Sequence, residues 1–294
     1  SLDSLPNDEF CYLAEHRTGN VCDYSATMPN FTPDQIVSDH FGNIYLLNRD
    51  NALLYRWSVS DSVYMKPLKV GLENGFHKKT PELIAYSEAH DRLYLGYNTG
   101  AIQYVDLQGN LVEQAFANIP LAVEGLAAVG NYILAQDGSG AWETHYIFDI
   151  AGNLTDSKDW NRYSREYAWN EALSRVYFFR DGTSPNDLNY ENVDQNTGLI
   201  VADGETPYHG GYSIQPPIRV SEDGQYVLLG SGDIYNAGDL TWSGSIGTSV
   251  DDALWLESVI VTIDSGSGAS NLSIWNATSY QREGSVSING EVLS

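Results

Sequence analysis

Residues 44–57 read IYLLNRDNALLYRW, and variants of this stretch recur along the chain. Two runs of aliphatic and aromatic side chains flank the polar triplet RDN, which is the pattern of two β-strands joined by a turn. Residues 93–104, LYLGYNTGAIQY, repeat the arrangement. One aromatic residue marks each copy, at Tyr45, Tyr94, Tyr132, Tyr177 and Tyr226, with Val259 taking its place in the last copy.

The spacing of these marker residues scatters around the ~40–50 residues that one four-stranded blade of a β-propeller occupies. Short apolar runs and period-two alternation occur throughout, and no helical i, i+3, i+4 pattern is sustained. A β-sandwich also alternates strands and turns, but it does not predict a repeating block of four strands. We therefore predict an all-β chain that folds as a single β-propeller.

Six blades fit the repeat, near residues 34–70, 82–119, 122–160, 165–204, 214–248 and 252–290. Unpaired edge strands invite aggregation, so a propeller is expected to close its ring. The N-terminal segment, residues 1–32, contains a hairpin pattern, and the C-terminal end supplies one more short apolar run. We predict a seventh blade built from both ends of one domain, residues 1–294. A six-bladed ring with an N-terminal strand extension is the alternative.

The formal charge is −24, from 39 acidic and 15 basic residues. Such a field repels phosphate backbones and anionic membranes, and no apolar run approaches the ~18 residues needed to cross a bilayer. We therefore expect no nucleic-acid binding and no membrane insertion. We also expect a monomer. The charge indicates either a solvated, aggregation-resistant surface or the binding of divalent cations or cationic partners.

The cysteines of the chain are Cys11 and Cys22, within two strand-like runs that a polar, glycine-containing turn separates. If the runs form a hairpin, the two thiols can face each other and form a disulfide. A disulfide indicates an oxidising compartment, so we expect an extracellular, cell-surface or periplasmic protein. The alternative is two free thiols in a cytosolic protein, without a metal because the chain has no CxxC motif.

Residues 220–229, VSEDGQYVLL, resemble the strand–turn–strand signature of the YVTN and lactonase-like propeller repeats, and residues 39–45, DHFGNIY, are a looser version. These repeats resemble a large superfamily of propellers without the WD motif, bacterial and often secreted. The resemblance implies a propeller fold over nearly the whole chain. It does not imply one function, because the superfamily contains both enzymes and binding proteins.

Propeller ligands usually sit near the central axis, at loops that join one blade to the next. In residues 71–80 such a loop carries His77, Lys78 and Lys79, which predict an anion or carboxylate site; a solvated loop is the alternative. In residues 159–166 the next loop carries Arg162 and Tyr163, which could hold a carboxylate or stack on a sugar; packing at the blade junction is the alternative.

A third loop, residues 205–217, places His209 beside two glycines and near Tyr212. A histidine there could act as a general acid or base, although a structural role is the alternative. In the fourth loop Asp251 and Asp252 could bind Ca²⁺ together with backbone carbonyls.

No HExxH or GxSxG motif occurs in the chain, so neither a zincin nor a serine hydrolase is indicated by sequence. The favoured function is a non-enzymatic, secreted or cell-surface propeller that binds a protein or a glycan. One alternative is an enzyme with an axial site, either a lactonase-like hydrolase or a polysaccharide lyase or hydrolase. The other is a structural module of a longer surface protein.

Overall fold

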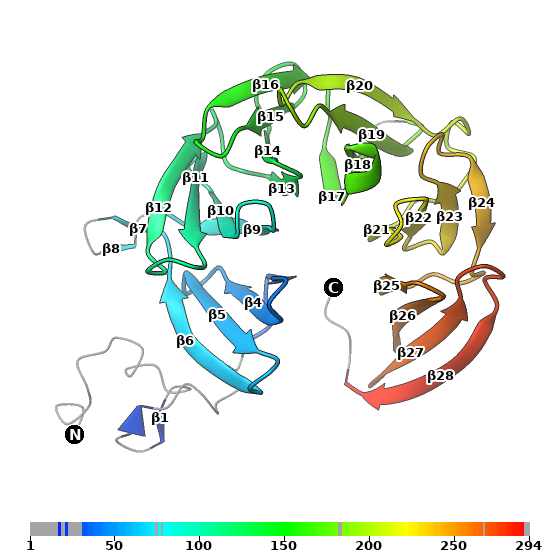
Figure 1. Ribbon diagram of the computed structural model, residues 1–294, viewed down its shortest axis with the longest axis horizontal. Helices are drawn as coiled ribbons and strands as arrows, with labels where there is room; N and C mark the ends of the chain where they lie inside the picture. Colours follow the sequence, from blue (N-terminus) through cyan, green and yellow to red (C-terminus); the bar gives the residue numbers. More distant parts are fainter. Residues whose placement is uncertain are drawn as a thin grey trace. The chain divides into compact units, whose positions relative to one another are not determined.

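The computed structural model describes residues 17–18, 21–22, 31–73, 76–77, 79–181, 184–266 and 268–290. The chain divides into two compact units, Ser1–Leu126 and Ala127–Ser294. Figure 1 labels strands of both units. Both units are built from β-strands. No helix within the described ranges is long and apolar enough to span a membrane.

Unit 1 contains two four-stranded antiparallel sheets and two short hairpins. The first four-stranded sheet consists of β3 (Gln35–Ser38), β4 (Asn43–Asn48), β5 (Leu53–Ser58) and β6 (Val63–Lys69). The second consists of β9 (Pro81–Ser87), β10 (Arg92–Tyr97), β11 (Ala101–Asp106) and β12 (Glu113–Asn118). The short hairpins are β1 (Arg17–Thr18) with β2 (Val21–Cys22), and β7 (Leu72–Glu73) with β8 (Phe76–His77).

Unit 2 is built around four further four-stranded sheets, the first of which begins at the unit boundary. The first two are β13 (Gly125–Val129), β14 (Tyr132–Asp137), β15 (Thr144–Phe148) and β16 (Leu154–Asp159), then β17 (Ser164–Asn170), β18 (Arg175–Arg180), β19 (Leu188–Val193) and β20 (Ile200–Glu205). The last two are β21 (Ile218–Val220), β22 (Tyr226–Leu229), β23 (Asp233–Asn236) and β24 (Trp242–Ser245), then β25 (Asp252–Leu256), β26 (Val259–Gly266), β27 (Ala269–Asn276) and β28 (Arg282–Asn289).

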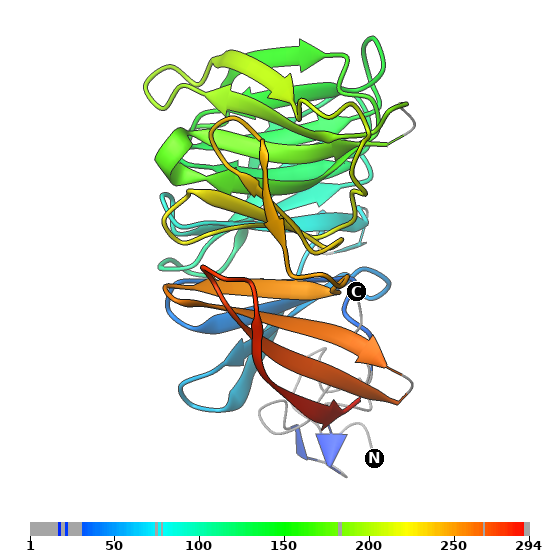
Figure 2. The same cartoon turned by 90° about the vertical axis from the view of Figure 1, so that its right-hand side faces the viewer.

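In every one of these sheets the strands pair in chain order, as in the blade of a propeller. The first strands of successive blades contact each other: β3 contacts β9 in unit 1, and β21 contacts both β17 and β25 in unit 2. In Figure 2 the orange and red strands β25–β28 show the twist that antiparallel sheets adopt. The prediction of an all-β propeller with four-stranded blades is confirmed.

The second strand of a blade lies between two neighbours in its own sheet and is covered on both faces. Its side chains are therefore buried without alternation and are mostly apolar: all residues of β14 are buried, as are those of β10 after its first residue. The marker tyrosines of the repeat fall on this strand. Tyr94 and Tyr177 are fully buried and Tyr45 is 3% exposed, which explains why an aromatic side chain recurs once in each repeat.

The prediction of seven blades is wrong, because the described residues form six four-stranded blades. Residues 252–289 supply all four strands of the last blade, so β28 closes that sheet as its edge strand. The hairpin of β1 and β2 forms a sheet of its own and joins no blade. The segment 252–290, predicted as the sixth blade, contains these four strands.

The cysteine pair is only partly described. In the β1–β2 hairpin, Cys22 lies opposite Arg17, so its direct cross-strand neighbour is not Cys11. Cys11 itself lies outside the described residues, and a disulfide between the two remains a prediction.

Candidate functional site

The loops that follow the second and fourth strands of a blade leave the sheet at the same edge, because these two strands run in the same direction. In the first two blades of unit 2 these loops form what we call the loop face. Its described residues are 138–143, 160–163, 181, 184–187 and 206–217. Loops held by rigid sheets are common positions for binding residues.

Three large aromatic side chains project from the loop face into solvent. Trp142, Trp160 and Tyr163 are 57%, 60% and 56% exposed. The ring centres of Trp142 and Trp160 lie 5.2 Å apart. The guanidinium carbon of Arg162 lies 4.5 Å from the ring centre of Trp142 and 5.7 Å from that of Tyr163. These four residues form one cluster, which we call the aromatic platform.

The backbone of the platform adopts an unfavourable conformation for such bulky residues. Trp142, Trp160 and Tyr163 have φ angles of +70°, +73° and +49°, in the left-handed region where each non-glycine residue costs about 1–3 kcal/mol. The amide of Trp160 donates to the carbonyl of Ala141 at 3.1 Å, which ties the two loops together. The fold therefore tolerates strain in an arrangement that exposes three aromatic rings.

Arg180, the last residue of β18, connects the platform to a second group of polar side chains. Its Nη1 donates to the carbonyl oxygen of Trp160 at 3.3 Å, and its Nε donates to Oδ1 of Asn189 at 2.9 Å. Its Nη2 lies 3.7 Å from Oε2 of Glu205. The platform and the Glu205 side chain are thus contiguous on the loop face.

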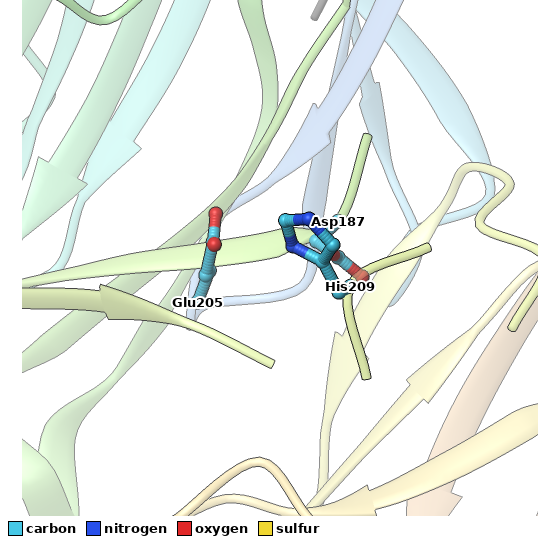
Figure 3. Close-up of side chains that lie close together, drawn as sticks. All are labelled: Asp187, Glu205 and His209. Atoms are coloured by element: carbon cyan, nitrogen blue, oxygen red, sulfur yellow. The ribbon is translucent and has the colours of Figure 1, made fainter. Parts of the chain in front are cut away.

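The second group consists of Asp187, Glu205 and His209, which we call the Asp–Glu–His cluster (Figure 3). One donor atom from each side chain lies within 4.8 Å of the others. Asp187 precedes β19, Glu205 ends β20, and His209 lies in the loop that follows β20. Oxygen and imidazole donors from three segments therefore meet where a single metal ion could contact all of them.

Neutral groups fix the carboxylate of Asp187, which is only 3% exposed. Its Oδ1 accepts a hydrogen bond from the Thr206 hydroxyl at 2.7 Å, and its Oδ2 accepts one from the Gly210 amide at 2.9 Å. His209 has a φ angle of +51° and Gly210 one of +77°. Asp187 thereby holds the loop that presents His209.

A different histidine lies in a buried network between the same two blades. His145 on β15 is fully buried; its Nδ1 lies 2.8 Å from Oε2 of Glu191, and its Nε2 lies 2.8 Å from Oγ of Ser164. This order of serine, histidine and acid is that of a catalytic triad. Ser164 is only 5% exposed, however, and its Oγ also bonds to the Tyr167 hydroxyl at 2.7 Å. We interpret the network as a structural link between blades.

The charge of Glu191 is compensated within this network. Burial alone would raise the pKa of Glu191, but the adjacent His145 and the ammonium of Lys158 outweigh it, so this pKa lies below its usual value. Lys158 Nζ lies 3.4 Å from Glu191 and 3.0 Å from Asp203 on β20. The carboxylate is therefore held ionised by its neighbours.

The predicted loop residues have separate surroundings. Arg162 and Tyr163 meet in the aromatic platform, and His209 belongs to the Asp–Glu–His cluster. Tyr212 belongs to neither group: its ring stacks on Trp242, with centres 5.8 Å apart, and packs against the core of the next blade. Part of the predicted loop, residues 205–217, therefore packs against the core of the next blade rather than joining either group.

In unit 1, Lys79 lies with its Nζ 5.7 Å from the ring centre of Tyr97, a cation–π contact. The backbone of His77 belongs to β8, whereas its side chain and the whole of Lys78 lie outside the described residues. The predicted anion site at this loop therefore remains a prediction.

The acidic pair in the fourth loop is engaged by protein groups. Asp252 Oδ1 lies 2.7 Å from Nη2 of Arg219, and Asp251 Oδ2 accepts from both the amide and the hydroxyl of Ser265 at 2.6 Å. A Ca²⁺ site at Asp251 and Asp252 remains a prediction.

Sequence reasoning missed Trp142 and Asp187. It considered only the loops between blades, whereas both residues lie in loops that follow the second strand of a blade. The signal was available, because these loops open at the same edge as the loops between blades once the strand order is known.

No family model matches the chain, and no curated protein matches it in sequence. Solved structures do match. The RRP9 WD40 repeats align with a TM-score of 0.63 at 12% identity, over 91% of this chain and 84% of theirs. A chain in the structure of the mitotic checkpoint complex aligns with a TM-score of 0.57 at 14% identity, over 91% and 89%. Dihydro-heme d1 dehydrogenase NirN aligns with a TM-score of 0.60 at 13% identity, over 90% of this chain and 57% of NirN. At these sequence identities the structural similarity shows the β-propeller fold alone.

Proposed function

We propose that this propeller is a binding module that captures a protein partner on its aromatic platform. The observation that carries the proposal is the exposure of Trp142, Trp160 and Tyr163 around Arg162, on a backbone held in the left-handed region. Tryptophan, tyrosine and arginine are the residues that contribute most binding energy at protein interfaces. An isolated exposed aromatic residue needs no explanation, but a cluster of this kind favours an interaction site.

The geometry of the rings favours a protein over a glycan. The planes of Trp142 and Trp160 are inclined by 56°, so they do not form one flat surface for a row of sugar rings. One face of Trp142 is also covered by the Arg162 guanidinium. An uneven surface of aromatic edges with one arginine suits a partner that inserts side chains and offers a carboxylate or carbonyl to Arg162.

The similar structures and the net charge are compatible with this role. One similar chain belongs to the structure of a complex, the mitotic checkpoint complex. The charge of −24 would steer a partner with cationic surroundings toward this protein. We extend the proposal to a secreted, cell-surface or periplasmic setting of the lactonase-like repeat type, on the sequence grounds of acidity, repeat signature and paired cysteines.

The test is selection of a displayed random-peptide library on the folded chain, with a glycan array and a lactone-hydrolysis assay in parallel. Selected peptides are expected to bind Trp160→Ala and Arg162→Ala at least about tenfold more weakly than the native chain. Leu154→Ala is the matched control, because Leu154 is 54% exposed in the same unit but lies on β16, outside the platform.

Peptides that bind Trp160→Ala and the native chain equally would contradict the platform as the recognition surface. Binding to glycans alone would contradict a protein partner. Hydrolysis of a lactone that Trp160→Ala retains and His209→Gln loses would favour the enzymatic alternative.

A further inference from the structure

We propose that Asp187, Glu205 and His209 bind one divalent transition-metal ion of the zinc class. This inference does not depend on the proposed protein partner, because it rests on the cluster alone.

The first argument is the unbalanced charge of Asp187. Asp187 is only 3% exposed. The described groups that donate hydrogen bonds to its carboxylate are a neutral hydroxyl and a neutral amide. None of the ion pairs between described residues includes Asp187. A buried carboxylate without a counter-charge is costly, and a cation held beside it would supply that charge.

The second argument is the orientation of the donor atoms. From the described residues each oxygen of Asp187 accepts one hydrogen bond, and each oxygen has a further lone pair. Ligands of protein metal sites are commonly held by such secondary hydrogen bonds. The same contact to Gly210 fixes the turn that carries His209. A Cβ atom added to Gly210 would lie 2.5 Å from Cβ of Pro185, so this turn is closely packed against its support.

The third argument is the chemistry of the donor set. Imidazole favours zinc and its transition-metal neighbours, whereas sites made only of oxygen favour calcium or magnesium. One nitrogen and two carboxylates give three protein ligands and leave a position for water or for a group of a partner. The three donor atoms lie within 4.8 Å of one another, and two zinc ligands at about 2.0–2.2 Å from the ion can be at most roughly 4.4 Å apart. Glu205 and His209 are exposed side chains and can adjust to meet that limit.

The positive charge of Arg180 opposes the binding of a metal ion at this cluster. Its Nη2 lies 3.7 Å from Glu205 Oε2, so an ion must share or displace this contact. The longer separation and the partial exposure of both side chains make the ion pair weak. Replacement of Arg180 should therefore strengthen metal binding and leave the donor set in place.

The test is a titration of the metal-free protein with ZnCl₂ by calorimetry, together with the visible absorption spectrum of the Co²⁺-loaded protein. We expect one Zn²⁺ per chain, a Co²⁺ spectrum that reports nitrogen and oxygen ligands, and at least about tenfold weaker binding in His209→Gln and in Asp187→Asn. Glu283→Gln is the control, because it removes an exposed carboxylate of the same unit that lies on β28, away from the cluster.

Asp187→Asn removes a group that holds its loop, so circular dichroism checks the fold of each variant. The result for His209→Gln decides whether the site exists. Zinc binding that His209→Gln leaves unchanged would overturn the site. Binding that Glu283→Gln weakens equally would show nonspecific attraction to an acidic protein and would also overturn it. Stronger binding of Ca²⁺ than of Zn²⁺ would overturn the assignment of the metal class.

Discussion

Two groups of histidine and carboxylate lie in neighbouring parts of unit 2 and have opposite surroundings. His145 and Glu191 are fully buried; His145 bonds to Glu191 and to Ser164, and the ammonium of Lys158 lies 3.4 Å from the Glu191 carboxylate. His209 is exposed beside a buried Asp187, whose hydrogen-bond partners among the described residues are a neutral hydroxyl and a neutral amide. Both groups contain a histidine beside a carboxylate. The difference shows that accessibility and unbalanced charge, rather than composition, distinguish a candidate site from a structural network.

The largest effect is expected from His145→Ala. This change leaves Glu191 buried without its principal partner and should lower the free energy of unfolding by about 3–5 kcal/mol. Urea denaturation monitored by tryptophan fluorescence measures it. His209→Gln is the matched comparison and should change stability by less than about 0.5 kcal/mol, as exposed substitutions do. Equal losses of unfolding free energy in the two variants would contradict the distinction between the buried His145 network and the exposed Asp–Glu–His cluster.

The pH dependence of stability should reveal the ionised Glu191. Its pKa is lowered in the folded chain by His145 and Lys158 against the effect of burial. The resulting stabilisation is complete above the ordinary pKa of a glutamate and is lost as the pH falls through the lowered value. Native protein should therefore be more stable than Glu191→Gln at pH 7, by about 1–3 kcal/mol. The difference should shrink toward pH 3 in urea denaturation series; a constant difference would contradict the lowered pKa.

Ser164→Ala tests the triad-like geometry of the buried network. Removal of this hydroxyl should cost about 1 kcal/mol of stability, measured by the same denaturation. Hydrolysis of p-nitrophenyl acetate should be equal for the native chain and the variant, because Ser164 is not accessible to a substrate. An ester hydrolysis that disappears in Ser164→Ala would show that the network is an active site.

The smallest effect on stability is expected from Trp160→Gly. Glycine adopts the φ angle of +73° at Trp160 without strain. The indole ring that the substitution removes is 60% exposed, so little buried contact is lost with it. Stability should change by less than about 1 kcal/mol, while peptide binding on the platform falls. Thermal unfolding and peptide affinity measured together check this. A large destabilisation would show that the ring belongs to the core.

The repeat of marker tyrosines was sufficient to predict a propeller of four-stranded blades, because Tyr45, Tyr94 and Tyr177 occupy buried positions on the second strand. The number of blades was not predictable in the same way, since the end segments carry strand-like patterns that do not show which sheet they join. Of the site, the sequence pointed to Arg162, Tyr163 and His209. Their partners Trp142 and Asp187 lie about 20 residues away along the chain, and only the order of strands in a blade brings such loops together.

The most direct test of the distinction between the two groups is the shift in melting temperature produced by ZnCl₂. At a concentration about 100 times the dissociation constant, the native chain should gain roughly 5 °C. Ser164→Ala, with its buried network damaged, should show the same gain, and His209→Gln should show none. A gain that His209→Gln retains and Ser164→Ala loses would contradict the account.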